Sequence, residues 1–315
     1  MESQSHMDLT SPPGVSVDGN TTVAPLNETS RMVKEGISGH IVASSVWFFV
    51  GFMYILSALR RFYVRQQTDQ KFVSSVEFPL DFLSGRFRNF PFIAVFKIVG
   101  ASVYLSIEII ATIVREPGCI ETPVWQHETM ATIFLMSGVV DMITLKTEGL
   151  NILPDGTDYL VFSLTFGIQV LQFYFHLEGR PPLGARLHAL QALLAAMCTL
   201  ALLMEAKYRS HVMMPVIRGY CIMAQGTWMM NLMFILYHPH SREQTWDLYA
   251  HESVDLVSLM FVYHLIMDML LVLVVNLLFV RAYSRPRCSY KFVPQTDSYD
   301  YNGKRQVLAM EKLTR

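Results

Sequence analysis

Leu270-Leu271-Val272-Leu273-Val274-Val275 forms the centre of a long stretch, residues 254–281, in which apolar side chains predominate. A bilayer core about 30 Å thick needs roughly 20 mostly apolar residues in helical conformation. Only helices and closed barrels satisfy their own backbone polar groups in lipid. This stretch therefore predicts a helix that crosses a membrane.

Two further stretches have equally apolar centres, beginning at Phe92 and Ala192. Two other predicted crossings are less uniform. Asp141 lies inside the crossing at 128–147, and Arg218 lies inside the crossing at 213–237. We expect an all-α polytopic membrane protein with a seven-helix bundle, and six or eight crossings are the alternatives. The predicted crossings are 40–59, 92–114, 128–147, 158–176, 185–205, 213–237 and 254–281.

The composition agrees with this class of protein. Hydrophobic residues make up 52% of the 315 residues and charged residues 16%, and both values depart from the average of soluble proteins. Buried core helices of a large soluble protein are the alternative interpretation. Such helices are usually shorter and are interleaved with amphipathic ones.

The Lys and Arg residues are distributed unevenly between the two predicted sides. Of the 25, 17 fall on the side of the C-terminus and six on the side of the N-terminus. Positive residues mark the cytoplasmic side, so we expect the N-terminus outside and the C-terminus inside. The predicted organisation is a disordered outer tail at 1–39, a transmembrane domain at 40–283 and a cytoplasmic tail at 284–315.

Three positions outside the crossings are candidates for modification. Asn20 and Asn27 each begin a glycosylation triplet in the outer tail, which would fit the predicted orientation. Cys288 follows the last crossing beside Arg285 and Arg287, a setting that permits palmitoylation, with an unmodified thiol as the alternative. The loop at 60–91 mixes aromatic and basic residues, which suits a segment in the headgroup layer.

Histidine and glutamate side chains gather near the predicted outer surface. This group could bind zinc, which takes nitrogen and oxygen ligands, or it could sense pH or relay protons. The third possibility is that amphipathic histidines tolerate the interface without sharing a site. The group consists of His40, Glu108, His127, Glu128, His176, Glu178, His188, His238, His240, His251 and Glu252.

Polar residues at greater depth form two further layers. Near the midplane lie Gln169, Gln225, His264 and Asp268. His264 and Asp268 are four apart on one helix, so they face the same way and could relay protons, orient a ligand or join helices by hydrogen bonds.

The third layer lies toward the cytoplasm and contains Asp141, Glu205 and Arg218. Glu205 ends one predicted crossing and Arg218 starts the next. We expect these two residues to form a structural ion pair, because an unpaired charge at that depth is costly.

Several of these positions belong to a recognisable pattern. The stretch His176-Leu177-Glu178-Gly179-Arg180-Pro181-Pro182-Leu183 is followed by His188, and Gln225-Gly226-Thr227-Trp228 lies in the sixth predicted crossing. In these motifs, and in Gly39-His40, Trp125-Gln126-His127 and His264, the chain resembles the transmembrane protein 45 family, which includes the transmembrane epididymal proteins. The resemblance covers roughly residues 39–282.

The resemblance implies a multi-pass membrane protein with about seven helices and no established reaction. The chain matches the family at His40, His127, His176, His188 and His264. It departs from the family at Gln169, Glu178, Gly184 and Arg186, where the family pattern has a glutamate, a histidine, an aspartate and a histidine. These departures remove metal ligands and add a positive charge, which argues against a metal site.

We therefore expect a noncatalytic membrane protein that interacts with the lipid bilayer and with unidentified proteins, not with nucleic acid. The sequence lacks the standard signatures of soluble enzymes, and we expect no cofactor. The alternative is a membrane-embedded, metal-dependent hydrolase or a proton or ion transporter that uses the outer histidines and glutamates, with zinc as the metal. The plasma membrane and the endomembrane system are the expected locations.

Overall fold

The computed structural model describes residues 26–78, 90–115, 122–147, 152–237 and 246–283. Within these residues the chain forms seven α-helices and no β-strand, which confirms the predicted all-α class. The helices are α1 (Leu26–Gln67), α2 (Phe92–Arg115), α3 (Thr122–Lys146), α4 (Thr157–Phe175), α5 (Pro182–Lys207), α6 (Met213–Tyr237) and α7 (His251–Tyr283).

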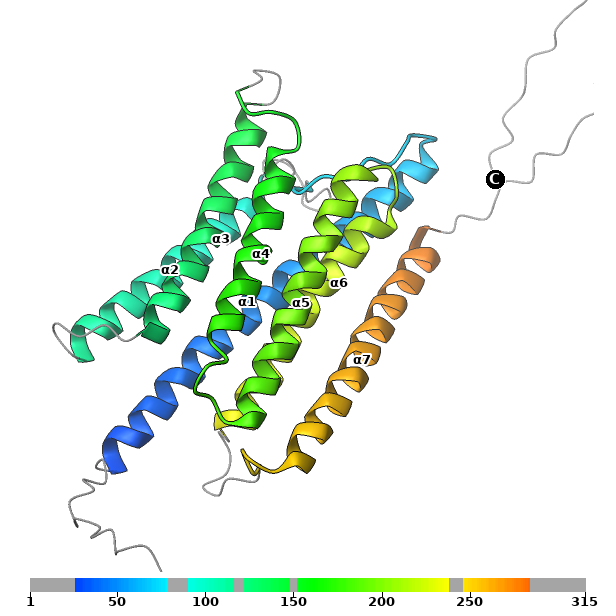
Figure 1. The fold of residues 1–315 in the computed structure, drawn as a ribbon. Coiled ribbons are helices and arrows are strands. Elements are labelled where there is room, and N and C mark those ends of the chain that lie inside the picture. The colour runs from blue at the N-terminus through cyan, green and yellow to red at the C-terminus, as the bar shows by residue number, and fades with distance from the viewer. Residues whose placement is uncertain (1–25, 79–89, 116–121, 148–151, 238–245, 284–315) are drawn as a thin grey trace, which may run out of the picture.

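The helices form one bundle whose centre is the layer made by α1, α6 and α5 (Figure 1). α6 packs along most of α1 and also against α5, and α4 connects α5 to α3. α2 packs chiefly against α3 at one side of the bundle. α7 lies at the other side, where it contacts α5, α1 and α6.

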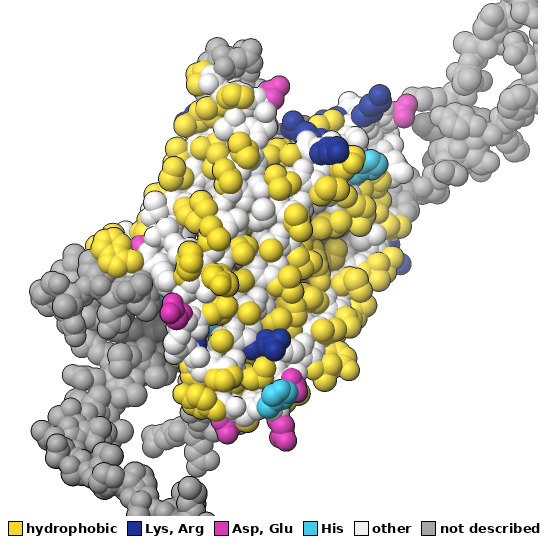
Figure 2. All heavy atoms as spheres, in the orientation of Figure 1, with side chains coloured by type: hydrophobic (Ala, Val, Ile, Leu, Met, Phe, Trp, Pro, Cys, Tyr) yellow, Lys and Arg dark blue, Asp and Glu magenta, His cyan; other side chains and the backbone are white. Residues whose placement is uncertain are grey.

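Five of the helices, α1, α2, α3, α5 and α7, contain a segment long enough and apolar enough to cross a membrane. Hydrophobic side chains cover the middle of the face shown in Figure 2, and charged side chains lie mainly toward its two ends. A surface of this kind is stable in lipid and not in water. The chain is therefore a membrane-embedded helical protein.

α4 and α6 coincide with the predicted crossings at 158–176 and 213–237, but they are not among these five helices. α6 lies against three other helices and buries Arg218 and Gln225, so its sequence need not be uniformly apolar. α4 turns Leu160, Leu164 and Leu171 outward and buries polar residues on its other side. Helix length and composition alone therefore support five crossings, and the count of seven stays a prediction.

α1 and α6 approach each other closely because both carry glycine at the contact. A Cβ atom added to Gly226 would lie 2.3 Å from the backbone nitrogen of Phe48. A Cβ atom added to Gly51 would lie 2.2 Å from the backbone nitrogen of Met223. Small residues allow this kind of backbone contact between membrane helices, and van der Waals packing then holds them together.

The segment 71–78, between α1 and α2, corrects the prediction for the loop at 60–91. Phe72, Ser74 and Val76 alternate with more exposed positions, and Glu77 and Phe78 after them are both buried, whereas a headgroup location would leave the aromatic rings exposed. The alternation is that of an extended chain with one side inward. The rest of this loop, residues 79–89, lies outside the described residues, and residues 60–67 belong to α1.

α1 also begins earlier than expected. The tail predicted at 1–39 lacks apolar periodicity, yet its last part is helical from Leu26 onward. This part contains Arg31, Met32, Lys34 and Glu35, which favour helix once the following apolar segment has nucleated one. Asn27 falls in the first turn of α1, whereas Asn20, His238, His240 and Cys288 lie outside the described residues.

Candidate functional site

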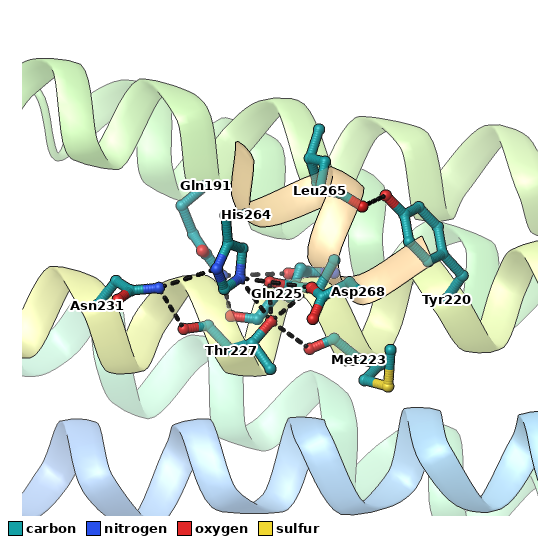
Figure 3. Close-up of polar contacts among 10 residues, drawn as sticks. Gln191, Tyr220, Met223, Gln225, Thr227, Asn231, His264, Leu265 and Asp268 are labelled. Carbon is teal, nitrogen blue, oxygen red and sulfur yellow. Dashed lines mark hydrogen bonds and ion pairs between the residues drawn. The ribbon is translucent and has the colours of Figure 1, made fainter. Parts of the chain in front are cut away.

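The midplane residues form a cluster between α6 and α7 that we call the α6–α7 cluster: Thr227, Asn231, His264 and Asp268. Figure 3 shows His264 and Asp268 pointing from α7 toward Thr227 and Asn231 on α6. Asp268 is buried and the other three side chains are half-buried. A stripe of α7 residues at helical spacing, including Val257, Phe261 and Val275, packs around them against the bundle.

A continuous series of hydrogen bonds connects these four side chains. Asn231 Nδ2 lies 3.0 Å from His264 Nδ1, and it also donates to the carbonyl oxygen of Thr227 at 3.2 Å. His264 Nε2 lies 2.8 Å from Thr227 Oγ1 and 3.4 Å from Asp268 Oδ2. Thr227 Oγ1 in turn donates to Asp268 Oδ2 at 2.8 Å.

These partners determine where the imidazole carries its proton. A carbonyl oxygen only accepts, so the Asn231 nitrogen is the donor that faces His264. His264 Nδ1 therefore accepts, and the proton of the neutral ring lies on Nε2, which faces Thr227 and Asp268.

The proton position decides what chemistry the cluster can perform. A nucleophilic threonine needs a base whose lone pair faces its hydroxyl. In the α6–α7 cluster the imidazole presents an N–H to that hydroxyl instead, and the carboxylate is on the same side of the ring as the hydroxyl. The arrangement does not match a hydroxyl–histidine–carboxylate triad, in which the carboxylate binds the other ring nitrogen. It joins α7 to α6.

Gln225, which is also drawn in Figure 3, makes its polar contacts with α5. Its Nε2 lies 3.0 Å from the sulfur of Cys198, and Gln191 Nε2 lies 3.4 Å from its carbonyl oxygen. Gln191, Gln225 and Cys198 are fully buried, and the side chain of Gln169 on α4 is almost fully buried. The amides of Gln191 and Gln225 therefore add polar contacts within the core without reaching His264, whereas Gln169 Oε1 has no hydrogen-bond partner among the described residues.

Three of the outer histidines come together around Arg180, and we call this set the outer histidine cluster: His127, His176, His188 and Arg180. The ring centroids of His127 and His176 are 5.6 Å apart, and those of His176 and His188 are 5.2 Å apart. α3 supplies His127, the turn after α4 supplies His176 and Arg180, and α5 supplies His188. Residues from three elements thus share one location.

His40 lies beside this cluster, and the other described members of the predicted outer group lie elsewhere. The ring of His40 on α1 packs 5.3 Å from that of Tyr237 on α6. Glu108 and Glu128 lie near Tyr104 at the contact of α2 and α3. Glu178, His251 and Glu252 are exposed, and His251 pairs with Asp255 on the surface of α7.

As arranged, the outer histidine cluster does not fit zinc. His176 Nδ1 lies 2.5 Å from Gln126 Oε1, and Arg180 Nη2 contacts His176 Nε2, so neither ring nitrogen offers a free lone pair. Across the described part of the chain, no group of three or more His, Cys, Asp or Glu side chains could hold a metal ion. The sequence indicates the histidines but gives no sign that Arg180 and Gln126 occupy the ring nitrogens of His176.

The inner layer contains two separate buried ion pairs. Arg218 Nη1 on α6 lies 3.2 Å from Glu205 Oε1 on α5, and both side chains are fully buried. Asp141 does not join them as predicted, because Lys97 Nζ on α2 lies 2.7 Å from its Oδ2. This pairing connects α2 to α3, and it gives Lys97 a partner within hydrogen-bond distance.

The segment 71–78 is bound to the inner layer by polar contacts. Ser74 Oγ contacts Glu205 Oε1, and Arg218 Nη2 donates to the carbonyl oxygen of Ser75 at 3.1 Å. The carboxylate of Glu77 accepts from the backbone nitrogens of Ile93 and Ala94, each at 3.0 Å. Glu77 therefore satisfies two donors in the first turn of α2, where a negative charge is also favoured by the helix dipole.

Fold and clusters together define a membrane-embedded helical protein whose deep polar groups connect neighbouring helices. Residues 155–277 match the model of a family described as a family of unknown function, DUF716. The matched region runs from the start of α4 into α7 and includes the α6–α7 cluster, Arg180, His188, Glu205 and Arg218.

Proposed function

We propose that the chain is a noncatalytic multi-pass membrane protein of the transmembrane protein 45 type. It crosses the bilayer seven times with its N-terminus outside, in the plasma membrane or the endomembrane system. Its outer face and tails engage partner proteins, and its buried polar groups organise the bundle. The match to a family of unknown function and the motifs around His176 and Gln225 support the assignment to this type.

One observation carries the noncatalytic proposal: the deep ionisable side chains described above are paired across helices. Lys97 with Asp141 joins α2 to α3, and Glu205 with Arg218 joins α5 to α6. Hydrogen bonds from His264 and Asp268 join α7 to α6. Interhelical hydrogen bonds and ion pairs are a common use of polar residues in membrane bundles.

The test is to reconstitute the purified chain into liposomes that contain a pH-sensitive dye and labelled phospholipid. We expect proton flux and fatty-acid release equal to those of empty vesicles, for the unmodified chain and for His264→Ala. The contrary result is flux or release above that background that His264→Ala abolishes. Tyr263→Phe, at an exposed position on the same helix, is the matched control.

The second candidate function is proton or ion transport, or metal-dependent hydrolysis, at the outer histidine cluster. The convergence of the three imidazole rings favours the transport form of this candidate, since such groups can pass protons. Metal analysis of detergent-purified protein, repeated with His176→Ala and His188→Ala, separates the two. Stoichiometric zinc that both variants lose would favour the second candidate over the noncatalytic protein.

A further inference from the structure

The outer histidine cluster carries a positive charge that the described residues do not neutralise. Arg180 Nε donates to the carbonyl oxygen of His176 at 2.8 Å, and Nη2 contacts the ring of the same residue. No carboxylate among the described residues forms an ion pair with Arg180, and Nη1 has no hydrogen-bond partner there. A half-buried guanidinium is strongly stabilised by an anionic partner that accepts its hydrogen bonds.

Burial lowers the pKa of Arg180, because a charged guanidinium loses solvation in this position. The other titratable side chains that face it belong to α1, α3, the turn after α4, α5 and α6. They are His40, His127, His176, His188 and Tyr237, and none of them is an acid that is ionised at neutral pH. The site is therefore neutral or positive on every described side.

The hydrogen bonds of the neighbouring imidazoles fix their tautomers. His188 Nδ1 lies 2.7 Å from the carbonyl oxygen of Gly184, which only accepts, so Nδ1 carries the proton and Nε2 is the basic nitrogen. His176 has the same tautomer, because Arg180 can only donate to its Nε2. Both rings are therefore neutral and place no negative charge beside Arg180.

The location of Arg180 in the fold also favours the binding of an anion. α5 begins at Pro182, two residues after Arg180, so the positive end of its dipole is directed at the same place. The turn at 176–181 connects two helices of a membrane-embedded bundle and lies at one end of that bundle (Figure 1). Phosphate groups of lipids are found at this level of a bilayer, and soluble phosphates reach it from the water.

We propose that Arg180, with His127, His176 and His188 around it, binds a phosphate-type oxyanion presented by a lipid headgroup or by a soluble phosphate. The guanidinium of Arg180 supplies the hydrogen-bond donors and the fixed positive charge. The proposal gives a ligand to the noncatalytic protein proposed above, and it requires only that the turn at 176–181 lies at a membrane surface.

The experiment measures the binding of two phosphates to the full-length protein in a neutral detergent at constant ionic strength. The probes are inorganic phosphate, with chloride as its control, and dioctanoyl phosphatidic acid, with dioctanoyl glycerol as its control. The variants are Arg180→Gln, which removes the charge, and Arg180→Lys, which keeps the charge but loses the fork. Arg186→Gln is the matched control, because Arg186 is an exposed arginine on the first turns of α5.

We expect Arg180→Gln to weaken binding by about tenfold or more, Arg180→Lys to lie in between, and Arg186→Gln to change it little. Binding of phosphatidic acid alone would identify the lipid headgroup as the source, and equal binding of both probes would identify phosphate in general. Failure of both probes to exceed their controls would overturn the proposal, as would unchanged binding by folded Arg180→Gln or Arg180→Lys.

This outcome is independent of the liposome experiment. A protein without flux or hydrolysis can still bind phosphate at Arg180, and an active protein can fail to bind it. Failure of the oxyanion site therefore leaves the noncatalytic proposal in place.

Discussion

Arg218 lies over the ring of Tyr54, with 4.1 Å between the guanidinium carbon and the ring centroid, and its Nη1 is 3.2 Å from Glu205 Oε1. Its Nη2 also donates a hydrogen bond to the carbonyl oxygen of Ser75. One fully buried side chain thus contacts α1, α5 and the segment 71–78. Arg218 therefore joins three separate parts of the chain at the inner end of the bundle.

Arg218→Ala should destabilise the protein by about 3–5 kcal/mol, because it leaves the buried carboxylate of Glu205 without its counter-charge. The yield of monodisperse protein in detergent and its melting temperature are the measurements. The combined variant Arg218→Met with Glu205→Gln should recover much of the loss, since it removes both charges. Lys207→Ala, at an exposed position next to the α5–α6 turn, is the control. A normal yield of Arg218→Ala would reject a stabilising role for the pair.

Gly226→Ala should separate α1 from α6, because the new methyl group would overlap the backbone of Phe48 and Ser44. We expect a clear decrease in melting temperature. It corresponds to a loss of about 1–3 kcal/mol in the free energy of unfolding, which is the usual effect of overpacking. Gly167→Ala on α4 is the matched control, since a Cβ atom there meets nothing within 4 Å. Equal stability of the two variants would show that the close approach of α1 and α6 is not present in the protein.

Thr227→Val keeps the shape of the side chain but removes the hydroxyl that contacts His264 and Asp268. The expected cost is about 0.6–2 kcal/mol, the range of interhelical hydrogen bonds in membranes. Thr227→Ser should remain close to the unmodified protein. Protease resistance of α7 provides a second readout, and a valine variant with unchanged melting and protease resistance would contradict the role assigned to the hydroxyl.

Glu77 gives the protein a predictable response to pH. Burial raises its pKa to about 7 from the ordinary 4.5, although the backbone N–H of Ile93 acts in the opposite direction. Because the folded state binds this proton more tightly than the unfolded state does, the contribution is full below about pH 4.5 and is lost as the pH rises through about 7.

Melting temperatures across this pH window should therefore decrease more steeply with rising pH for the unmodified protein than for Glu77→Gln. The exposed Glu178→Gln should follow the unmodified curve. Parallel curves for Glu77→Gln and the unmodified protein would show that this carboxyl group titrates normally.

The sequence was most informative where structure is local. The apolar centre at Leu270 lies in a single helix, and the spacing of His264 and Asp268 puts both on one side of α7. Glu205 and Arg218 could be paired because a short turn separates their helices.

Contacts between distant segments could not be derived in this way. Lys97 and Asp141 belong to different helices, and no spacing rule relates them. The burial of Phe78 depends on packing against other elements, so its aromatic character fitted a lipid surface equally well. Arg180 was counted as one of the outer charges, and its contact with His176 became visible only when the turn after α4 was in place.

The count and direction of the crossings are the central claim, and inserted glycosylation sites test it most directly. Asn20→Gln and Asn27→Gln remove the two native N-terminal triplets, and a flexible insert with one triplet is placed in the turn at 176–181, in the turn at 208–212 or at the C-terminus. Seven crossings with the N-terminus outside predict a glycan, removable by endoglycosidase, on the first insert only. A glycan at the C-terminus or in the turn at 208–212 would contradict the account.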